Sequence, residues 1–166
     1  MIDRMARRSA VLKTALALIA CLLMDVSRQA YADEVDDTAL TLVRERNLGD
    51  SLGWLGYQVA SRTVTFATLV ETLGKTQAQE LVQGELQRLQ PEFQAQWDRN
   101  LAAAYAHAFT AEELRSLNAG DDSPALANKF KAKNSEVGAD MKARSADLLG
   151  RFVSQALGNA QQSLNH

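Results

Sequence analysis

Residues 123–160 read SPALANKFKAKNSEVGADMKARSADLLGRFVSQALGNA, and this stretch decides the fold. Ser123 and Pro124 supply an N-cap and a first-turn proline, so the stretch predicts one long helix that reaches about Ala160. Its apolar residues recur every eleven positions, which corresponds to three turns of a nearly straight helix. The two series are Leu126, Val137 and Leu148, and Phe130, Met141 and Phe152. This pattern predicts a helix that buries one face along its length.

Shorter helices are expected before this one, joined by short links. The ranges that we predict are 36–47, 51–73, 76–90, 91–109 and 110–118. Thr76 with Gln79, and Thr110 with Glu113, are both spaced as capping boxes. Pro91 is expected to stop or kink one helix, and it can equally begin the next.

The composition favours helix throughout. Hydrophobic residues make up 46% of the chain and charged residues 23%, which excludes a disordered chain, and there are only two prolines. Thr63-Val64-Thr65-Phe66 is β-branched and could form a strand, which leaves helix or strand open over 62–69. We expect helix there because a lone strand would have no sheet to join. The predicted fold is all-α, an irregular bundle of five or six helices in a single domain, 33–166.

The N-terminus has the pattern of a secretory signal peptide. A ten-residue apolar run, Ala15–Met24, is too short for a membrane span, which needs about 20 residues. Ala30-Tyr31-Ala32 then provides the small residues that a signal peptidase recognises. Basic residues precede the run: Arg4, Arg7, Arg8 and Lys13. We therefore predict a signal peptide over 1–32, cleavage after Ala32 and a periplasmic mature protein.

Cys21 provides an alternative to this cleavage. Leu18-Ile19-Ala20-Cys21 resembles a lipoprotein box, in which the cysteine would become a lipid anchor. The apolar residues that follow Cys21 disfavour this alternative, because a lipidated cysteine is normally followed by polar chain. Cleavage after Ala32 would leave no cysteine, and it would then exclude disulfides and thiol catalysis.

Removal of residues 1–32 makes the protein acidic, with a net charge of −5. An acidic exported protein is a poor nucleic-acid binder, so no nucleic-acid partner is expected. The last helix is locally basic, through Lys129, Lys131, Lys133, Lys142, Arg144 and Arg151. This pattern is typical of a solvated face, and contact with an anionic membrane surface is the alternative.

One segment resembles a known family. Phe109-Thr-Ala-Glu-Glu-Leu-Arg-Ser-Leu117, followed by Ser123-Pro124, is similar to the uncharacterised secreted bacterial family catalogued as domain of unknown function 2059. The similarity covers about residues 91–135. The chain departs from the family pattern at Gly120-Asp121, where an aromatic pair is usual, and at Leu126, where glycine is usual. The resemblance implies a signal peptide and a helical mature region, and it implies no activity.

Residues that could carry chemistry are few. The chain has no nucleophile, zinc or phosphate-binding motif, and His107 is the one internal histidine of the mature region. Glu112-Glu113 and Asp121-Asp122 are explained by a helix start and a turn, with a calcium loop at Asp121 as the alternative. We therefore predict no catalytic residue, metal or cofactor. The candidate residues for a ligand or partner surface, which could equally be core, are Trp54, Tyr57, Trp97, Tyr105 and His107.

Three functions remain open at this point. The first expectation is a non-enzymatic envelope protein that binds a protein or peptide through a helical surface. The second is a carrier or sensor of an apolar small molecule or lipid in a bundle cavity. The third is a hydrolase-like enzyme around His107. An exposed apolar patch would favour the first, a large apolar pocket the second, and a carboxylate within reach of His107 the third.

Overall fold

The computed structural model describes residues 31–121 and 123–164, and helix is the only regular structure in them. The predicted all-α irregular bundle is therefore confirmed. A helical segment covers 31–45, and five labelled helices follow it: α2 (Leu52–Ala60), α3 (Val64–Leu73), α4 (Lys75–Ala108), α5 (Ala111–Asn118) and α6 (Pro124–Ser163). None of these helices is long and apolar enough to span a membrane. Residues 1–30, which hold most of the signal peptide predicted over 1–32 and include Cys21, lie outside the described residues.

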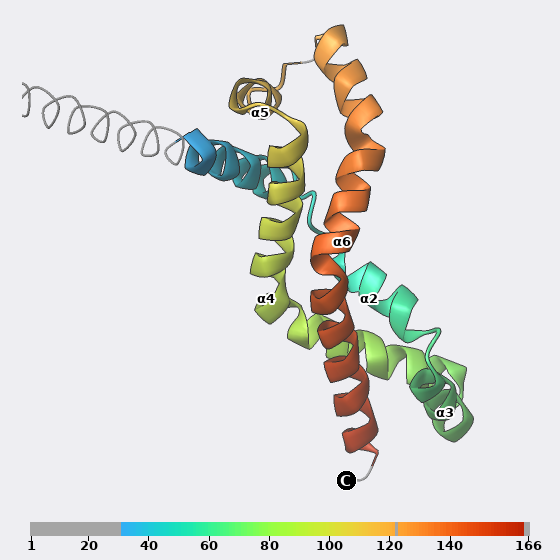
Figure 1. Ribbon diagram of the computed structural model, residues 1–166. Helices are drawn as coiled ribbons and strands as arrows, with labels where there is room; N and C mark the ends of the chain where they lie inside the picture. Colours follow the sequence, from blue (N-terminus) through green and yellow to red (C-terminus); the bar gives the residue numbers. More distant parts are fainter. Residues whose placement is uncertain (1–30, 122, 165–166) are drawn as a thin grey trace, which may run out of the picture.

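The two long helices α4 and α6 form the framework of the molecule. They run antiparallel in Figure 1, where α6 (orange to red) extends along the whole length of the elongated molecule. They pack together more extensively than any other pair of helices. α2 and α3 cover one end of this pair, and the helical segment over 31–45 lies near the other end (Figure 1). The buried hydrophobic residues of these elements, Leu126 excepted, form one hydrophobic cluster.

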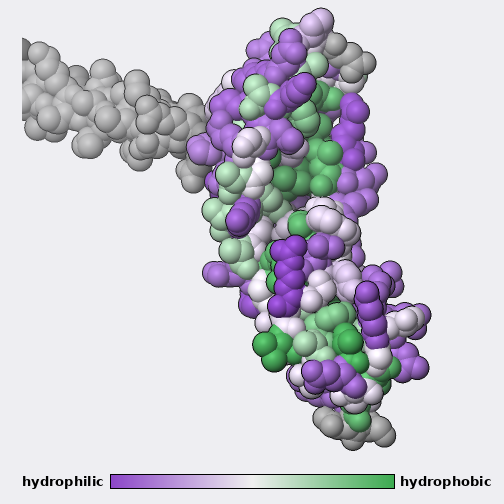
Figure 2. Space-filling view, turned by 90° about the vertical axis from the view of Figure 1, so that its right-hand side faces the viewer, coloured by the Kyte–Doolittle hydropathy of each residue, from purple (hydrophilic) through white to green (hydrophobic). Residues whose placement is uncertain are grey.

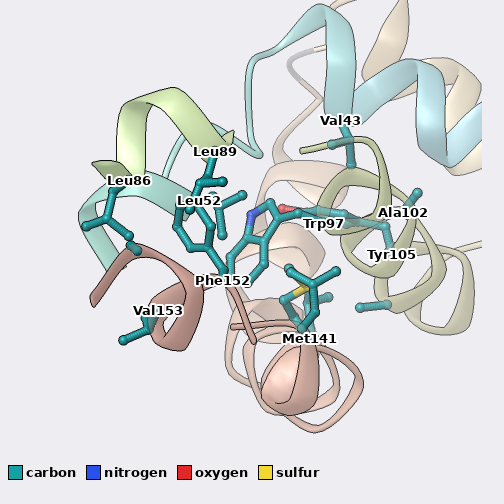
Figure 3. Close-up of a cluster of buried hydrophobic side chains, with 14 of the residues drawn as sticks. Val43, Leu52, Leu86, Leu89, Trp97, Ala102, Tyr105, Met141, Phe152 and Val153 are labelled. Carbon is teal, nitrogen blue, oxygen red and sulfur yellow. The ribbon is translucent and has the colours of Figure 1, made fainter. Parts of the chain in front are cut away.

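The eleven-residue stripe of α6 is the buried face that the sequence predicts. Five of its six members are buried, and Phe130 is half-buried. Phe152 has no exposed surface. In Figure 3 its ring lies close to Leu52 of α2 and Leu86 of α4, so one side chain joins three helices.

Pro91 does not end a helix, which corrects the two predicted helices over 76–90 and 91–109. α4 continues through Pro91 without a break and is 34 residues long in total. A proline inside a helix removes one amide donor and crowds the preceding turn, and the helix can respond by bending. Figure 1 shows α4 changing direction along its length. The predicted start at Thr76 also shifts, since α4 begins at Lys75 after Gly74, whose φ is +82°.

The predicted helix over 51–73 is two helices. α2 ends at Ala60, and Thr63 is extended, with φ −91° and ψ 154°. The Thr63 hydroxyl accepts a hydrogen bond from the Phe66 amide at 3.2 Å, so Thr63 is the N-cap of α3. The threonine therefore starts a new helix, and the alternative of a strand over 62–69 is excluded.

Glycines let α2 approach α4 and α6 closely. A Cβ added to Gly56 would lie 2.6 Å from Cε1 of Phe152 and 3.1 Å from Cδ2 of Leu86. A Cβ added to Gly53 would lie 2.9 Å from Oε1 of Gln90. The approach to Phe152 is too short for a real Cβ atom, whereas the end of the flexible Gln90 side chain could move aside. Gly56 therefore sets how near α2 lies to α6.

α5 is held by the capping box that the sequence predicts. The Glu113 amide donates to the Thr110 hydroxyl, and the Glu113 carboxylate accepts from the Thr110 amide at 2.9 Å. The second carboxylate oxygen of Glu113 accepts from Lys129 of α6 at 2.5 Å. Ser123 occupies the predicted N-cap position of α6, but its hydroxyl accepts no capping hydrogen bond. Its amide donates to Oδ1 of Asp121.

Candidate functional site

An apolar groove opens between α2 and α6, with α4 beneath it. Its volume is about 630 Å³. Figure 2 shows the side of the molecule that is on the right of Figure 1, where hydrophobic patches lie between hydrophilic ones. Hydrophobic side chains from α2, α4, α6 and the turn before α2 line the groove: Leu48, Leu55, Val59, Trp97, Leu101, Met141 and Leu149.

The groove continues towards the start of α3. A second hollow of about 350 Å³ shares Val59 and Gly150 with the first, so the two adjoin, and we treat them as two sections of one groove. Val153, Leu157 and Gly158 of α6 line this second section.

Glycines on α6 keep the groove open. Each of the three glycines in this helix, at positions 138, 150 and 158, lines one or both sections of the groove. A Cβ built on any of them meets no atom within 4 Å, so packing does not require glycine there. Glycine is less favourable than alanine inside a helix by about 1 kcal/mol. These glycines therefore contribute open space to the groove, where any other residue would place a side chain.

Trp97 contributes hydrocarbon surface to the groove and no hydrogen-bond donor. Its side chain is 4% exposed, and its indole N–H is buried without a partner among the described residues. In Figure 3 the indole nitrogen lies on the side of Leu52 and Leu89. Because the nitrogen has almost no accessible surface, a molecule in the groove meets the ring and not the N–H.

The five residues singled out from the sequence do not form one site. Trp97 lies in the groove, whereas Trp54 and Tyr57 line a separate hollow of about 390 Å³ with glutamines of α4. Trp54 is 64% exposed. Tyr105 belongs to the core, where its ring stacks on Phe130 at 5.9 Å, and burial raises the pKa of its hydroxyl.

His107 lies on the surface beside a carboxylate. Its side chain is 71% exposed, and its Nδ1 is 3.4 Å from Oδ2 of Asp140. That oxygen is buried and accepts no hydrogen bond within the described residues, while Oδ1 accepts from Nε of Arg144 at 2.9 Å. A histidine and a carboxylate are thus near each other, but no hydroxyl or thiol in the described part of the chain is hydrogen-bonded to His107. The pair lacks the nucleophile that hydrolase chemistry of this type requires.

Three of the six basic residues of α6 singled out from the sequence, Lys129, Lys133 and Arg144, form ion pairs within the described part of the chain. Lys129 joins Glu113, and Lys133 joins Glu136. The bond from Lys129, with that from the Thr110 amide, holds the pKa of Glu113 below its ordinary value. No group of three or more potential metal ligands occurs in residues 31–121 and 123–164, and Asp121 caps the turn to Ser123.

The groove itself was not predicted from the sequence. Its walls come from three helices, and Leu55, Leu101 and Leu149 each fit an ordinary amphipathic pattern. The three glycines of α6 were a weak sign only, because Gly84 of α4 is also a helix-interior glycine without a tight contact and it lies outside the groove.

No protein-family model, curated protein or solved structure matches this chain, so the resemblance of residues 91–135 to a family of secreted bacterial proteins stays a prediction.

Proposed function

We propose that this protein is a non-enzymatic binding protein that holds an apolar small molecule in the groove between α2 and α6. The observation that carries the proposal is the groove of about 630 Å³ with apolar walls. Ligand sites for small molecules have volumes of roughly 300–1,000 Å³ and mostly hydrophobic linings. The second of the three functions considered from the sequence is therefore the best supported.

The size of the groove favours a small molecule over a protein partner. Thirteen residues line the main section, whereas a standard protein interface involves about 20–30 residues on each side. A protein or peptide partner remains the second candidate, supported by the exposed side chains of Trp54 and Val64. Trp54 lies in a different hollow and Val64 lines neither section of the groove. Single exposed apolar residues of this kind are common on protein surfaces.

The cost of the α6 glycines supports the same proposal. Three helix-interior glycines together lower the stability of α6 by about 2–3 kcal/mol relative to alanine. Alanine would fit at all three positions, since a Cβ there meets no atom within 4 Å. Space for a ligand explains why the helix carries glycines where packing would accept alanine.

We also propose that the protein works in the periplasm after cleavage behind Ala32. The basic leader, the ten-residue apolar run and Ala30-Tyr31-Ala32 support this location. An apolar molecule needs a protein to carry it through an aqueous compartment, so the location and the groove are consistent with each other.

The test is the binding of a neutral, apolar, environment-sensitive dye, such as Nile red, to the purified protein. Gly150→Leu places a side chain where the two sections of the groove meet and should weaken binding by at least about ten-fold, equivalent to roughly 1.4 kcal/mol. Gly84→Leu is the matched control, because Gly84 is also an exposed helical glycine with no atom within 4 Å, and it lines neither section of the groove. Absence of dye binding by the unmodified protein, or equal loss in both variants, would refute the proposal.

The enzyme alternative has its own test. If His107 serves no catalysis, a folded and normally exported His107→Ala variant should fully complement a deletion strain. Failure of that variant to complement would support chemistry at the His107–Asp140 pair and would contradict a purely binding role.

A further inference from the structure

A single charged residue lines the groove. Among the described residues around its two sections, Lys142 of α6 is the only one with a charge. Lys142 is exposed and makes no ion pair or hydrogen bond with the described part of the chain. Other cations of α6 are held differently, since Lys133 pairs with Glu136 and Arg144 pairs with Asp140. Lys142 therefore presents an available positive charge to whatever occupies the groove.

The position of Lys142 makes the groove asymmetric. It lies one helical turn from Gly138, at one end of the groove, while an uncharged wall continues to Leu157. The second section of this wall mixes hydrophobic with polar side chains, among them Thr63, Thr65 and Ser154. The axial distance from Lys142 to Leu157 is about 22 Å, at about 1.5 Å per residue. Such a length matches an extended long acyl chain. The groove thus has a cation near one end and a long uncharged wall beyond it.

We infer that the ligand is a single-chain amphiphile with a carboxylate headgroup, the chemistry of a long-chain fatty acid. This inference rests on the proposed function of the groove. The Lys142 ammonium pairs with the carboxylate, and the chain lies along α6 past Gly150 towards Val153 and Leu157. The glycines at 150 and 158 leave room for a chain of methylenes beside the helix.

A peptide fits the same groove less well. Each residue of a peptide brings an amide N–H and a carbonyl that require hydrogen-bond partners when they are buried. In the main section the polar side chains are those of Ser51, Lys142 and Ser145. The Ser145 hydroxyl is already engaged, since it accepts from Asn100 at 3.0 Å and donates to the sulfur of Met141. An acyl chain has no backbone polar groups that need hydrogen-bond partners, and its single carboxylate can pair with the single cation, Lys142.

The test compares palmitic acid with its neutral alcohol at concentrations where both are monomeric, by calorimetric titration of the full mature protein. The acid should bind about five-fold more tightly than the alcohol, the gain expected from one partly exposed ion pair. Lys142→Gln should abolish this difference and leave the affinity for the alcohol unchanged. Lys131→Gln is the matched control, because Lys131 is another exposed, unpaired lysine of α6 that does not line the groove, and it should preserve the difference.

The outcomes separate the two proposals. Equal binding of acid and alcohol, or a preference for the acid that survives Lys142→Gln, overturns the headgroup assignment while the groove remains a binding site. Equal effects of Lys142→Gln and Lys131→Gln also overturn it, because they would indicate a general effect of charge. Failure of both ligands and of the neutral dye to bind would overturn the proposed function itself.

Discussion

Gly56→Ala should destabilise the protein although alanine is the better helix former. Gly56 lies in the middle of α2, and the new methyl group would be 2.6 Å from Cε1 of Phe152 and 3.1 Å from Cδ2 of Leu86. Phe152 has no exposed surface and Leu86 is 2% exposed, so neither side chain can move into solvent. The substitution must therefore push α2 away from α4 and α6 or force side chains out of their rotamers.

The expected change follows from two opposed contributions. The helix gains about 0.8–1.0 kcal/mol from replacing glycine by alanine. Overpacking of a filled core costs about 1–3 kcal/mol. The net loss in the free energy of unfolding should therefore be about 0–2 kcal/mol, measured by equilibrium denaturation in urea. Gly84→Ala is the control, and it should gain about 0.5–1 kcal/mol because nothing lies within 4 Å of its Cβ.

A second variant shows whether the cost arises at Phe152. In a Phe152→Leu background the nearest obstructing atom is removed, so Gly56→Ala should cost clearly less there than in the unmodified protein. If Gly56→Ala stabilises the protein as much as Gly84→Ala, then α2 does not contact α6 at this point. In that case α2 would also not line the groove as described.

Further predictions concern the processing, the core and the helix-capping network. N-terminal analysis of the mature protein should begin at Asp33, whereas a lipid-modified Cys21 at the terminus would show that the protein is membrane-anchored. Phe152→Ala should lower the free energy of unfolding by about 3–5 kcal/mol, and Phe130→Ala by clearly less because that ring is half-buried; equal losses in denaturant melts would contradict the packing described for α6. Glu113→Gln should destabilise the protein at neutral pH. The difference in stability from the unmodified protein should shrink as the pH falls through the lowered pKa of the Glu113 carboxyl, because the protonated carboxyl loses the same interactions. A difference in stability that is independent of pH over that acidic range would show that the ion pair contributes nothing to stability.

The long helices could be predicted because their patterns are local and repetitive. The eleven-residue series in α6 identified a buried face from Leu126 to Phe152, and most of it is buried. The Thr110–Glu113 capping box is also local, since both of its hydrogen bonds join residues three apart. Each of these features is decided by neighbours along the chain, which a sequence displays directly.

The errors occurred where two local rules compete. Pro91 can end a helix or bend it, and in α4 the helix continues with buried residues on both sides of the proline. Thr63 can lie inside a helix or cap the next one, and here the hydrogen bond from the Phe66 amide accompanies a new start. The apolar periodicity continues across both positions, so it could not distinguish the alternatives.

The site was harder to predict than the fold because it depends on distances between helices. Trp97 was identified as a candidate, but its partners in the groove come from α2 and α6, far away in the sequence. Gly150 and Lys142 carry no motif, and they gain meaning only when the neighbouring helices place apolar walls beside them. His107 attracted attention because the only other histidine of the sequence is His166, yet its side chain is 71% exposed and lies outside the groove.

The most direct test of the account is native mass spectrometry of the protein purified without detergent from the cells that produce it. The account predicts a fraction carrying a small apolar adduct that denaturation releases, and the same adduct on Gly84→Leu. Gly150→Leu, with the groove obstructed, should carry little or none. A protein that never carries an adduct, or an adduct that is equally abundant on Gly150→Leu, would contradict the claim that this groove is the binding site.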